Sequence, residues 1–168
     1  MRRLTGTGSA DALRRVVQSG EFDTLQVPYN LLNPSAGRTM PQDFSDRNYG
    51  NVLEDCRKLN LGAFAIRVLA GGAIVGQSPS AHTLRTSYFP LSHYEAELQS
   101  VAAARGELDP AEFAKLAIQF ALQHSAVHAA IMGFGSVEHV DASVAAAWCE
   151  GHRYAARSEP RPPEQPSE

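Results

Sequence analysis

The sequence predicts an α/β fold in which helices cover a sheet of parallel strands. Short runs that are apolar at nearly every position alternate with segments of helical periodicity. Strands buried on both faces are typical of parallel sheets, and strand–helix alternation is typical of α/β folds. The clearest strands end in Gly, Pro or polar residues and lead into loops or a helix. Such ends are consistent with one ligand-binding mouth, so we expect a layered α/β sheet or a part of a (β/α)8 TIM barrel.

Composition and charge exclude several classes of protein. A chain of 168 residues is one domain or part of one. Its formal net charge of -3 provides no basic surface for nucleic acid, and no apolar run reaches the ~18 residues of a membrane helix. The amino-terminal segment lacks the apolar core of a signal peptide, and the few cysteines indicate reduced thiols. We therefore expect a cytoplasmic protein with no nucleic-acid and no membrane partner.

The amino-terminal segment predicts a strand, a helix and a second strand. Residues 1–4 are a strand or the stub of one. Apolar residues at helical spacing predict a helix over 9–20, with a serine cap at its start and Gly20 at its end. The apolar run 22–28 is the first clear strand. The loop that follows, 30–43, is rich in Asn, Pro and Gly and too long for a simple connection, so we interpret it as functional.

The middle of the chain predicts a helix, a strand and another long loop. One apolar stripe predicts a helix over 46–60. The members of this stripe are Tyr49, Val52, Leu53, Cys56 and Leu59. The run 61–74 predicts a strand that ends in the pair Gly71–Gly72, and residues 75–91 form the second long loop. Because loops over a rigid scaffold usually carry function, we expect the two long loops to select the substrate.

Two helices are predicted before the last strand. The first, over 92–106, has Leu98 and Val101 facing inward and a glycine at its end. The second, over 109–124, has the strongest local signal, because an Asp-Pro pair caps and begins it. Its inward face repeats at helical spacing. The residues on that face are Phe113, Leu116, Ala117, Phe120 and Ala121.

The carboxyl-terminal part predicts a third strand, a closing helix and a tail. The run 127–134 is almost wholly apolar, which predicts a buried strand. Residues 136–148 predict a helix. Its inward side chains are Val137, Val140, Val144 and Trp148. Residues 151–168 are polar and rich in proline, so we expect disorder there. The folded domain is therefore predicted to be 1–150.

Three blocks of this chain resemble the second half of an aldo/keto reductase. They are "FDTLQVPYNLLNP", "LGAFAIRVLAGGAI" and "AIQFALQHSAVHAAIMGFGSVEHVDASVAA", in that order. By this resemblance they are strands six, seven and eight of the family's (β/α)8 barrel with their helices, and "RRLTGTG" is the trailing edge of strand five. The resemblance covers roughly residues 3–148. It implies a partial TIM barrel that is the C-terminal, cofactor-binding half of an NAD(P)H-dependent oxidoreductase.

Gln26 lies inside the first clear strand, where a carboxamide needs a hydrogen-bond partner. One interpretation is a partner within the protein. The resemblance implies another, because the matching glutamine of the family hydrogen-bonds the nicotinamide carboxamide and so determines which hydride is delivered. By resemblance, Gln26 is then a cofactor-binding residue and a nicotinamide dinucleotide is the partner. A small carbonyl compound is the implied substrate of the full-length protein.

The strand-seven block implies contacts near the middle of the cofactor. Gly71 and Gly72 match the loop near the pyrophosphate, where glycine permits close approach of the backbone; they equally fit a simple turn of the chain. The segment Ile66–Leu69 stands where many members have aromatic-Ser-Pro-Leu, and Leu69 belongs to the implied cofactor site. Arg67 meets either a phosphate or substrate anion or an acidic side chain, because an unpaired charge there is costly.

The strand-eight block implies the adenosine end of the site. Gly133, Gly135 and Ser136 match the family's loop of small residues before the last helix, whose N-terminus favours an anion. His139 stands where many members carry an arginine for the 2′-phosphate, and Ser143 where an asparagine reads the adenine. The family implies NADP(H) rather than NAD(H). A neutral histidine replaces a guanidinium poorly, which weakens that preference.

By resemblance, the catalytic Asp, Tyr, Lys and His of the family come from the first half of the barrel. Lys58 and Lys115 fall on predicted helices and cannot replace that lysine, and the histidines show no metal-ligand spacing. We therefore assign no catalytic or metal residue and expect no turnover by the chain alone. The alternatives are an inactive half-barrel that binds a dinucleotide or regulates, and one chain of a split enzyme. With open sheet edges the chain should be poorly soluble, pair with a second half-barrel or self-associate.

Overall fold

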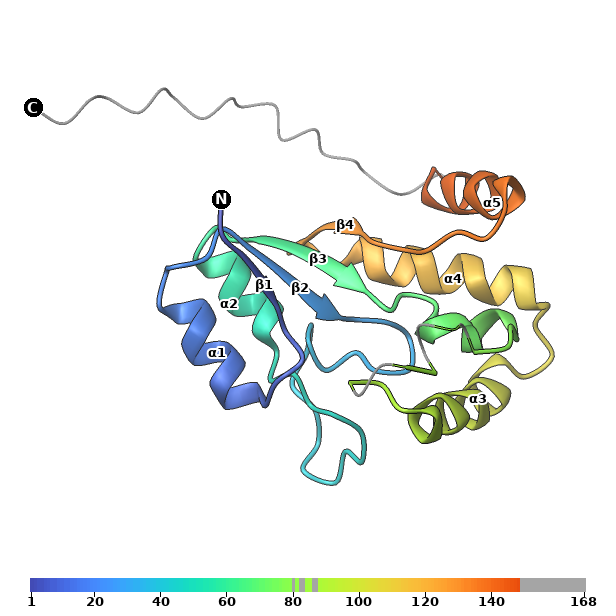
Figure 1. Ribbon diagram of the computed structural model, residues 1–168, viewed down its shortest axis with the longest axis horizontal. Helices are drawn as coiled ribbons and strands as arrows, with labels where there is room; N and C mark the ends of the chain where they lie inside the picture. The colour runs from blue at the N-terminus through green and yellow to red at the C-terminus, as the bar shows by residue number, and fades with distance from the viewer. Residues whose placement is uncertain (80, 82–83, 86–87, 149–168) are drawn as a thin grey trace, which may run out of the picture.

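The computed structural model describes residues 1–79, 81, 84–85 and 88–148 and confirms the α/β class (Figure 1). Its strands form one parallel sheet in chain order: β1 Arg3–Thr5, β2 Thr24–Pro28, β3 Gly62–Ile66 and β4 Val127–Ala130. The helices are α1 Ala10–Gln18, α2 Val52–Lys58, the 3-10 helix η1 Ala70–Val75, α3 Leu91–Arg105, α4 Pro110–Gln123 and α5 Val137–Ala147. The predicted tail, 151–168, lies outside the described residues.

One face of the sheet is covered by helices and the other is half open. Leu25 and Val27 of β2 are fully buried, and they belong to one core cluster with side chains of α1, α2 and α4. Gln26 and Phe64 are aligned in register on the alternate face, and both are partly exposed. This second face is the one that lines the interior when a sheet closes into a barrel.

The predicted helix boundaries with strong caps are confirmed. The Asp109 side chain accepts a hydrogen bond from the Ala111 N–H at 2.8 Å, and Pro110 begins α4. Gly20 follows α1 with φ of 70°, and Gly106 follows α3 with φ of 57°. Glycine adopts this left-handed region without the clash of a Cβ, so it ends a helix at low cost.

The helix predicted over 46–60 was wrong at its start, because α2 begins only at Val52. Gly50 and Asn51 have φ of 66° and 55° and cannot continue a right-handed helix. Tyr49 is nevertheless buried, with 1% exposure. The apolar spacing thus identified the core residue correctly, while the backbone around it is a loop.

Two predicted strands were too long. The strand predicted over 61–74 ends at Ile66, because Arg67 turns to φ of 54°. The strand predicted over 127–134 ends at Ala130. Its last residue pairs with Ala65, one residue before β3 ends. The first apolar run continues into η1 and the second into a loop, and periodicity cannot distinguish either from a strand.

The inward face predicted for the closing helix was wrong. The side chains predicted to face inward are 38% to 78% exposed: Val137, Val140, Val144 and Trp148. The buried side of α5 instead carries Ser143 and Ala146, and Gln119 of α4 donates to the Ala146 carbonyl at 3.3 Å. Leu98 and Leu116, also predicted to be inward, are 37% and 43% exposed. A sequence shows that a helix has an apolar stripe, but it does not show whether another element of the fold covers that stripe.

A second core cluster joins η1 to two helices. Ala70 and Ile74 of η1 cluster with Tyr94 and Val101 of α3 and with Phe113 of α4. In Figure 1, η1 (green) and α3 lie beyond the arrowheads of β2 and β3. The helix α3, packed on η1, therefore lies beside the carboxyl edge of the sheet, where the loops after β2 and β3 begin.

Candidate functional site

The segments expected to bind a cofactor lie at one edge of the sheet. Because all strand pairs are parallel, the carboxyl ends of β2, β3 and β4 meet there. Gly71–Gly72 follow β3, residues 133–136 follow β4, and Gln26 lies near the end of β2. Ligands of open α/β sheets bind outside the carboxyl ends of strands. The structure thus places these three segments at the edge where a ligand is expected.

Gln26 faces the half-open side of the sheet, in register with Thr5 of β1 and Phe64 of β3. Its backbone carbonyl accepts a hydrogen bond from the Gly6 N–H at 2.7 Å. Its side-chain amide has no hydrogen-bond partner among the residues that the structure describes. The amide is therefore open to a partner from outside this part of the chain.

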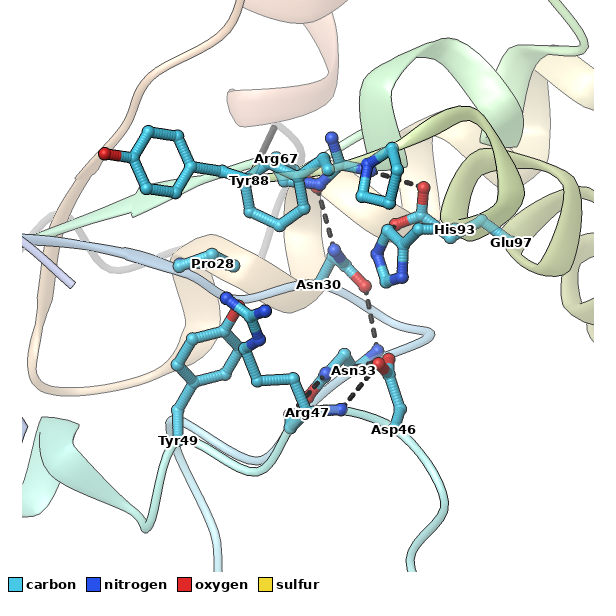
Figure 2. Close-up of a pocket in the computed structure, with 12 residues that line it drawn as sticks. Pro28, Asn30, Asn33, Asp46, Arg47, Tyr49, Arg67, Tyr88, His93 and Glu97 are labelled. Carbon is cyan, nitrogen blue, oxygen red and sulfur yellow. Dashed lines mark hydrogen bonds and ion pairs between the residues drawn. The ribbon is translucent and has the colours of Figure 1, made fainter. Parts of the chain in front are cut away.

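The loops after β2 and β3 border a cavity of about 340 Å³ (Figure 2). Residues of α3 and of the segment before α2 complete its wall. Its lining is mainly polar and aromatic: Asn30, Asn33, Asp46, Arg47, Tyr49, Arg67, Tyr88, Phe89, His93 and Glu97. Burial raises the pKa of Tyr49 to about 12, so this phenol is neutral at physiological pH.

Two buried asparagines give the loop after β2 its shape. Asn30 donates through Nδ2 to the Arg67 carbonyl at 2.9 Å. Its Oδ1 accepts from the N–H groups of Leu32 and Asn33 at 3.0 and 2.9 Å. Asn33 in turn donates to Asp46 Oδ2 at 2.8 Å. Since both asparagines are used inside the protein, they build the wall of the cavity rather than offer free groups to a ligand.

Arg67 is bound by α3. Its guanidinium forms an ion pair with the Glu97 carboxylate, and the two side chains are only 12% and 9% exposed. Its Cζ lies 4.0 Å from the centroid of the Phe89 ring, which adds a cation–π contact. His93 Nε2 lies 3.3 Å from the other oxygen of Glu97. Of the two interpretations predicted for Arg67, the structure shows the pair with an acidic side chain.

Gly71 and Gly72 occupy backbone conformations that other residues avoid, with φ of 65° and 102°. A Cβ at Gly71 would lie 3.2 Å from Arg67 Nη1, and a Cβ at Gly72 would lie 3.3 Å from Gln77 Cβ. Leu69 is partly buried and packs against both core clusters. The turn therefore has no side chain of its own, and Leu69, two residues before Gly71, anchors its start in the core.

The segment between β4 and α5 is open to solvent. Gly133, Gly135, Ser136 and His139 are exposed, whereas Ser143 is only 9% exposed. Ser136 Oγ caps α5 by accepting a hydrogen bond from the His139 N–H at 3.4 Å. Of the residues predicted for the adenosine end, the structure therefore places four at the surface and buries the fifth against the body of the chain.

Glu138 is a charge at this end that sequence reasoning missed. A hydrogen bond with the Ser136 side chain, assisted by a backbone hydrogen bond, lowers the pKa of Glu138. The carboxylate is therefore ionised at the N-terminus of α5, where the helix dipole favours it. The stretch 127–148 contains no Lys or Arg. A second anion brought to this helix end meets the negative charge of Glu138, and no Lys or Arg of the stretch 127–148 offsets it.

Neither lysine of the chain lines the cavity. Lys58 and Lys115 pair with glutamates of their own helices at 3.6 and 4.0 Å. Tyr29 stacks on Phe120 with ring centroids 5.0 Å apart, and burial raises its pKa. The described residues contain no group of His, Cys, Asp and Glu that could hold a metal ion. Over the same ranges, no helix combines the length and apolarity needed to cross a bilayer.

The model of the aldo/keto reductase family matches residues 6–150. The chain belongs to the aldo/keto reductase family. Among solved structures, an aldo-keto reductase of Bacillus halodurans in its holo form is similar, with a TM-score of 0.55 and 14% sequence identity. The match covers 83% of this chain and 40% of that reductase. At this identity the likeness shows the fold. A search of curated proteins finds no significant match.

Sequence reasoning missed the α3 residues that shape the mouth of this family member. The predicted inward face of that helix was assigned to Leu98 and Val101. The structure buries Tyr94, Glu97 and Val101, which are spaced i, i+3 and i+7 on one face. That spacing was visible, but a glutamate in it is normally taken as solvated. The burial of Glu97 becomes understandable only from its ion pair with Arg67, which is distant in the sequence.

Proposed function

We propose that this chain is the C-terminal, cofactor-binding half of an NAD(P)H-dependent oxidoreductase of the aldo/keto reductase family. The observation that carries the proposal is Gln26, whose amide faces the half-open side of the sheet without a partner among the described residues. The family match supports the reaction class, and the 40% span of the Bacillus reductase supports the assignment to part of a barrel. In the full-length protein, the reaction interconverts a small carbonyl compound and its alcohol.

The residues present fit a nicotinamide dinucleotide. The Gln26 side chain offers a carbonyl oxygen and an NH₂ group, which complement the same two groups of a carboxamide. The Gly71–Gly72 turn has positive φ values and is partly exposed, so its backbone is accessible to a pyrophosphate. The exposed residues Gly133 and Gly135 leave the N-terminus of α5 accessible to a phosphate, and the ionised Glu138 there reduces the attraction of the helix dipole. When bound, the cofactor supplies the hydride for the carbonyl carbon.

The roles of this chain are binding and orientation. Gln26 fixes which face of the ring points toward the substrate, and the neighbouring Phe64 provides apolar surface on the same side of the sheet. Asn30 keeps the loop after β2 attached to the start of the loop after β3. The proton for the carbonyl oxygen comes from residues outside this chain. We therefore infer that the chain alone binds the cofactor and does not turn over substrate.

The preference for NADP(H) over NAD(H) follows from the family and stays a prediction. His139 replaces the usual arginine, and the ionised Glu138 precedes it. This local charge opposes a 2′-phosphate. Titration with NADPH and with NADH decides the question. Tighter binding of NADPH keeps the preference, while equal or tighter binding of NADH overturns it.

A second candidate function follows from the exposed face of the sheet and the exposed side of α5. In this alternative the chain is a cytoplasmic half-barrel subunit, which either binds a dinucleotide without catalysis, regulates, or forms one chain of a split enzyme. Its partner is a second half-barrel chain or another copy of itself. Carbonyl reduction that appears only after a second polypeptide is added supports the split enzyme. A monodisperse monomer that melts cooperatively contradicts the pairing.

The test of the proposed function is a fluorescence titration of the chain with NADPH and NADH. Gln26→Ala should weaken binding roughly thirtyfold, because two hydrogen bonds of about 1 kcal/mol each are lost. Gln99→Ala, at an exposed glutamine of α3, is the control and should leave the affinity unchanged. If the wild-type chain binds neither dinucleotide, or if Gln26→Ala binds as tightly, the proposal fails. Carbonyl reduction by the chain alone would contradict the assignment of catalysis to another part.

A further inference from the structure

The inner face of α3 combines apolar and ionisable side chains. Tyr94 and Val101 belong to the core cluster that contains η1, and Glu97 lies between them at 8% exposure. A carboxylate at such a position is costly unless it is paired. An apolar residue would pack there at less cost, since buried ion pairs are often replaceable without loss of stability. The charge of Glu97 therefore requires an explanation other than stability.

The partner of Glu97 sits directly over the glycine turn. The Arg67 guanidinium pairs with Glu97 (Figure 2), and its Nη1 lies 3.2 Å from the position that a Cβ of Gly71 would occupy. Arg67 itself has φ of 54°, a strained conformation for a residue with a side chain. Such a conformation persists where surrounding contacts enforce it. The ion pair provides such a contact at the first residue after β3.

A second contact from α3 holds the other end of the turn. The Tyr94 hydroxyl donates to the Gln77 carbonyl. The Gln77 N–H donates to the Gly72 carbonyl at 3.1 Å, and a Cβ at Gly72 would lie 3.3 Å from Gln77 Cβ. Two neighbouring side chains of one helix face, Tyr94 and Glu97, thus fix the two flanks of the same glycine turn.

We propose that Glu97 and Tyr94 are positioning residues that hold the Gly71–Gly72 turn in the shape that receives the cofactor pyrophosphate. This inference rests on the function proposed above and adds residues of α3 to it. Neither residue needs to touch the cofactor. Glu97 acts through Arg67, and Tyr94 acts through Gln77. The polar side chains on α3 orient the turn, while its apolar side chains hold the helix in place.

The experiment measures the turn and the ligand separately in the same variants. Glu97→Gln and Tyr94→Phe remove the two contacts at nearly constant shape. Glu95→Gln makes the same change of charge at an exposed site of α3 and is the matched control. Hydrogen exchange is followed at the amides of Gly72 and Gln77, and the Kd for NADPH is measured by fluorescence.

Amide exchange at the turn should accelerate about tenfold to hundredfold in Glu97→Gln. The substitution weakens a hydrogen bond between charged groups, and the loss of such a bond makes local opening easier by about this factor. The Kd for NADPH should rise about tenfold in parallel, and Tyr94→Phe should act in the same direction. Glu95→Gln should change neither quantity. A variant destabilised elsewhere, Val17→Ala at a fully buried position of α1, should lower global stability and leave both the turn and the Kd unchanged. This last comparison separates positioning from a general loss of stability.

The contrary outcomes are distinct. Unchanged exchange in Glu97→Gln means that α3 does not order the turn, which overturns the inference. Faster exchange with an unchanged Kd means that the turn does not receive the cofactor, which also overturns it but leaves Gln26 as a binding residue. Failure of the wild-type chain to bind NADPH or NADH refutes the proposed function, and the role in cofactor binding falls with it. In that case the exchange data still show whether Glu97 and Tyr94 order the turn.

Discussion

Gly37→Ala tests how tightly the loop after β2 is packed onto α4. A Cβ at Gly37 would lie 2.7 Å from His124 Cδ2 and 2.7 Å from Tyr29 Cε2. Neither ring can move away freely. Tyr29 stacks on Phe120 at 5.0 Å and meets the edge of His124 at 5.4 Å. His124 is held through both nitrogens, since Nε2 donates to the Gly37 carbonyl at 3.1 Å and Nδ1 accepts from the Ala126 N–H at 3.2 Å.

The expected loss of stability combines three terms. Overpacking of a tight site costs about 1–3 kcal/mol. Displacement of the His124 ring weakens its bond to the Gly37 carbonyl, which adds about 1 kcal/mol. Replacing glycine with alanine restricts the unfolded chain and returns about 0.4–1 kcal/mol. We therefore expect Gly37→Ala to lower the free energy of unfolding by about 1–4 kcal/mol, and the Tm by about 2–14 °C.

Urea unfolding followed by circular dichroism provides the measurement. Gly8→Ala is the control, because a Cβ there meets no atom within 4 Å and the φ of Gly8 is not in the left-handed region. This control should be neutral or slightly stabilised. If Gly37→Ala is as stable as Gly8→Ala, the loop after β2 moves freely on α4 and the reasoning from steric contact is refuted.

Two further predictions concern ionisable groups on α2. Burial raises the pKa of the Cys56 thiol to about 12. In a Cys149→Ser background, a thiol reagent at pH 8 should therefore label Cys56 only as urea unfolds the chain. Rapid labelling of the native protein would contradict this. A hydrogen bond with Arg57 lowers the pKa of Glu54 from 4.5 to about 2. Because the folded pKa is depressed, any stability from this pair is present above about pH 4.5 and is lost as the pH falls through about 2. An NMR titration should show this pKa, and Arg57→Gln should return it toward 4.5; an unchanged pKa in that variant would refute the assigned cause.

The parallel arrangement of the sheet and the main helix ends could be predicted because their signals are local. The Asp-Pro start of α4 and the glycines after α1 and α3 are each specified by a residue or two. Alternation of strands and helices predicts parallel neighbours without any knowledge of distant contacts. The glycine pair after β3 was predicted as either a cofactor loop or a simple turn of the chain, and φ values of 65° and 102° at Gly71 and Gly72 favour glycine in both cases.

The end of β3 could not be predicted, because it depends on a residue far along the chain. Nothing in the apolar run 61–74 indicates that it leaves the strand conformation at Arg67. The cause is the buried pair with Glu97, and the same pair was the part of the mouth that sequence reasoning missed. The position of Asn30 at the end of β2 was visible, but its bond to the Arg67 carbonyl was not. Local sequence patterns carry no information about long-range polar contacts such as these.

The three segments at the carboxyl edge are held to very different degrees. The loop after β2 is fixed by buried asparagine side chains, and the loop after β3 is fixed by α3. The segment after β4 has neither kind of support, because Gly133 and Gly135 are exposed and a Cβ at either would meet nothing closer than 3.8 Å. Regions with few buried contacts open at the lowest free energy. For the proposed function, we therefore expect the nicotinamide and pyrophosphate contacts to be pre-organised and the adenosine end to become ordered on binding. Loss of the α3 contacts should therefore weaken binding through the pre-organised part, whereas substitutions after β4 should act mainly on the bound state.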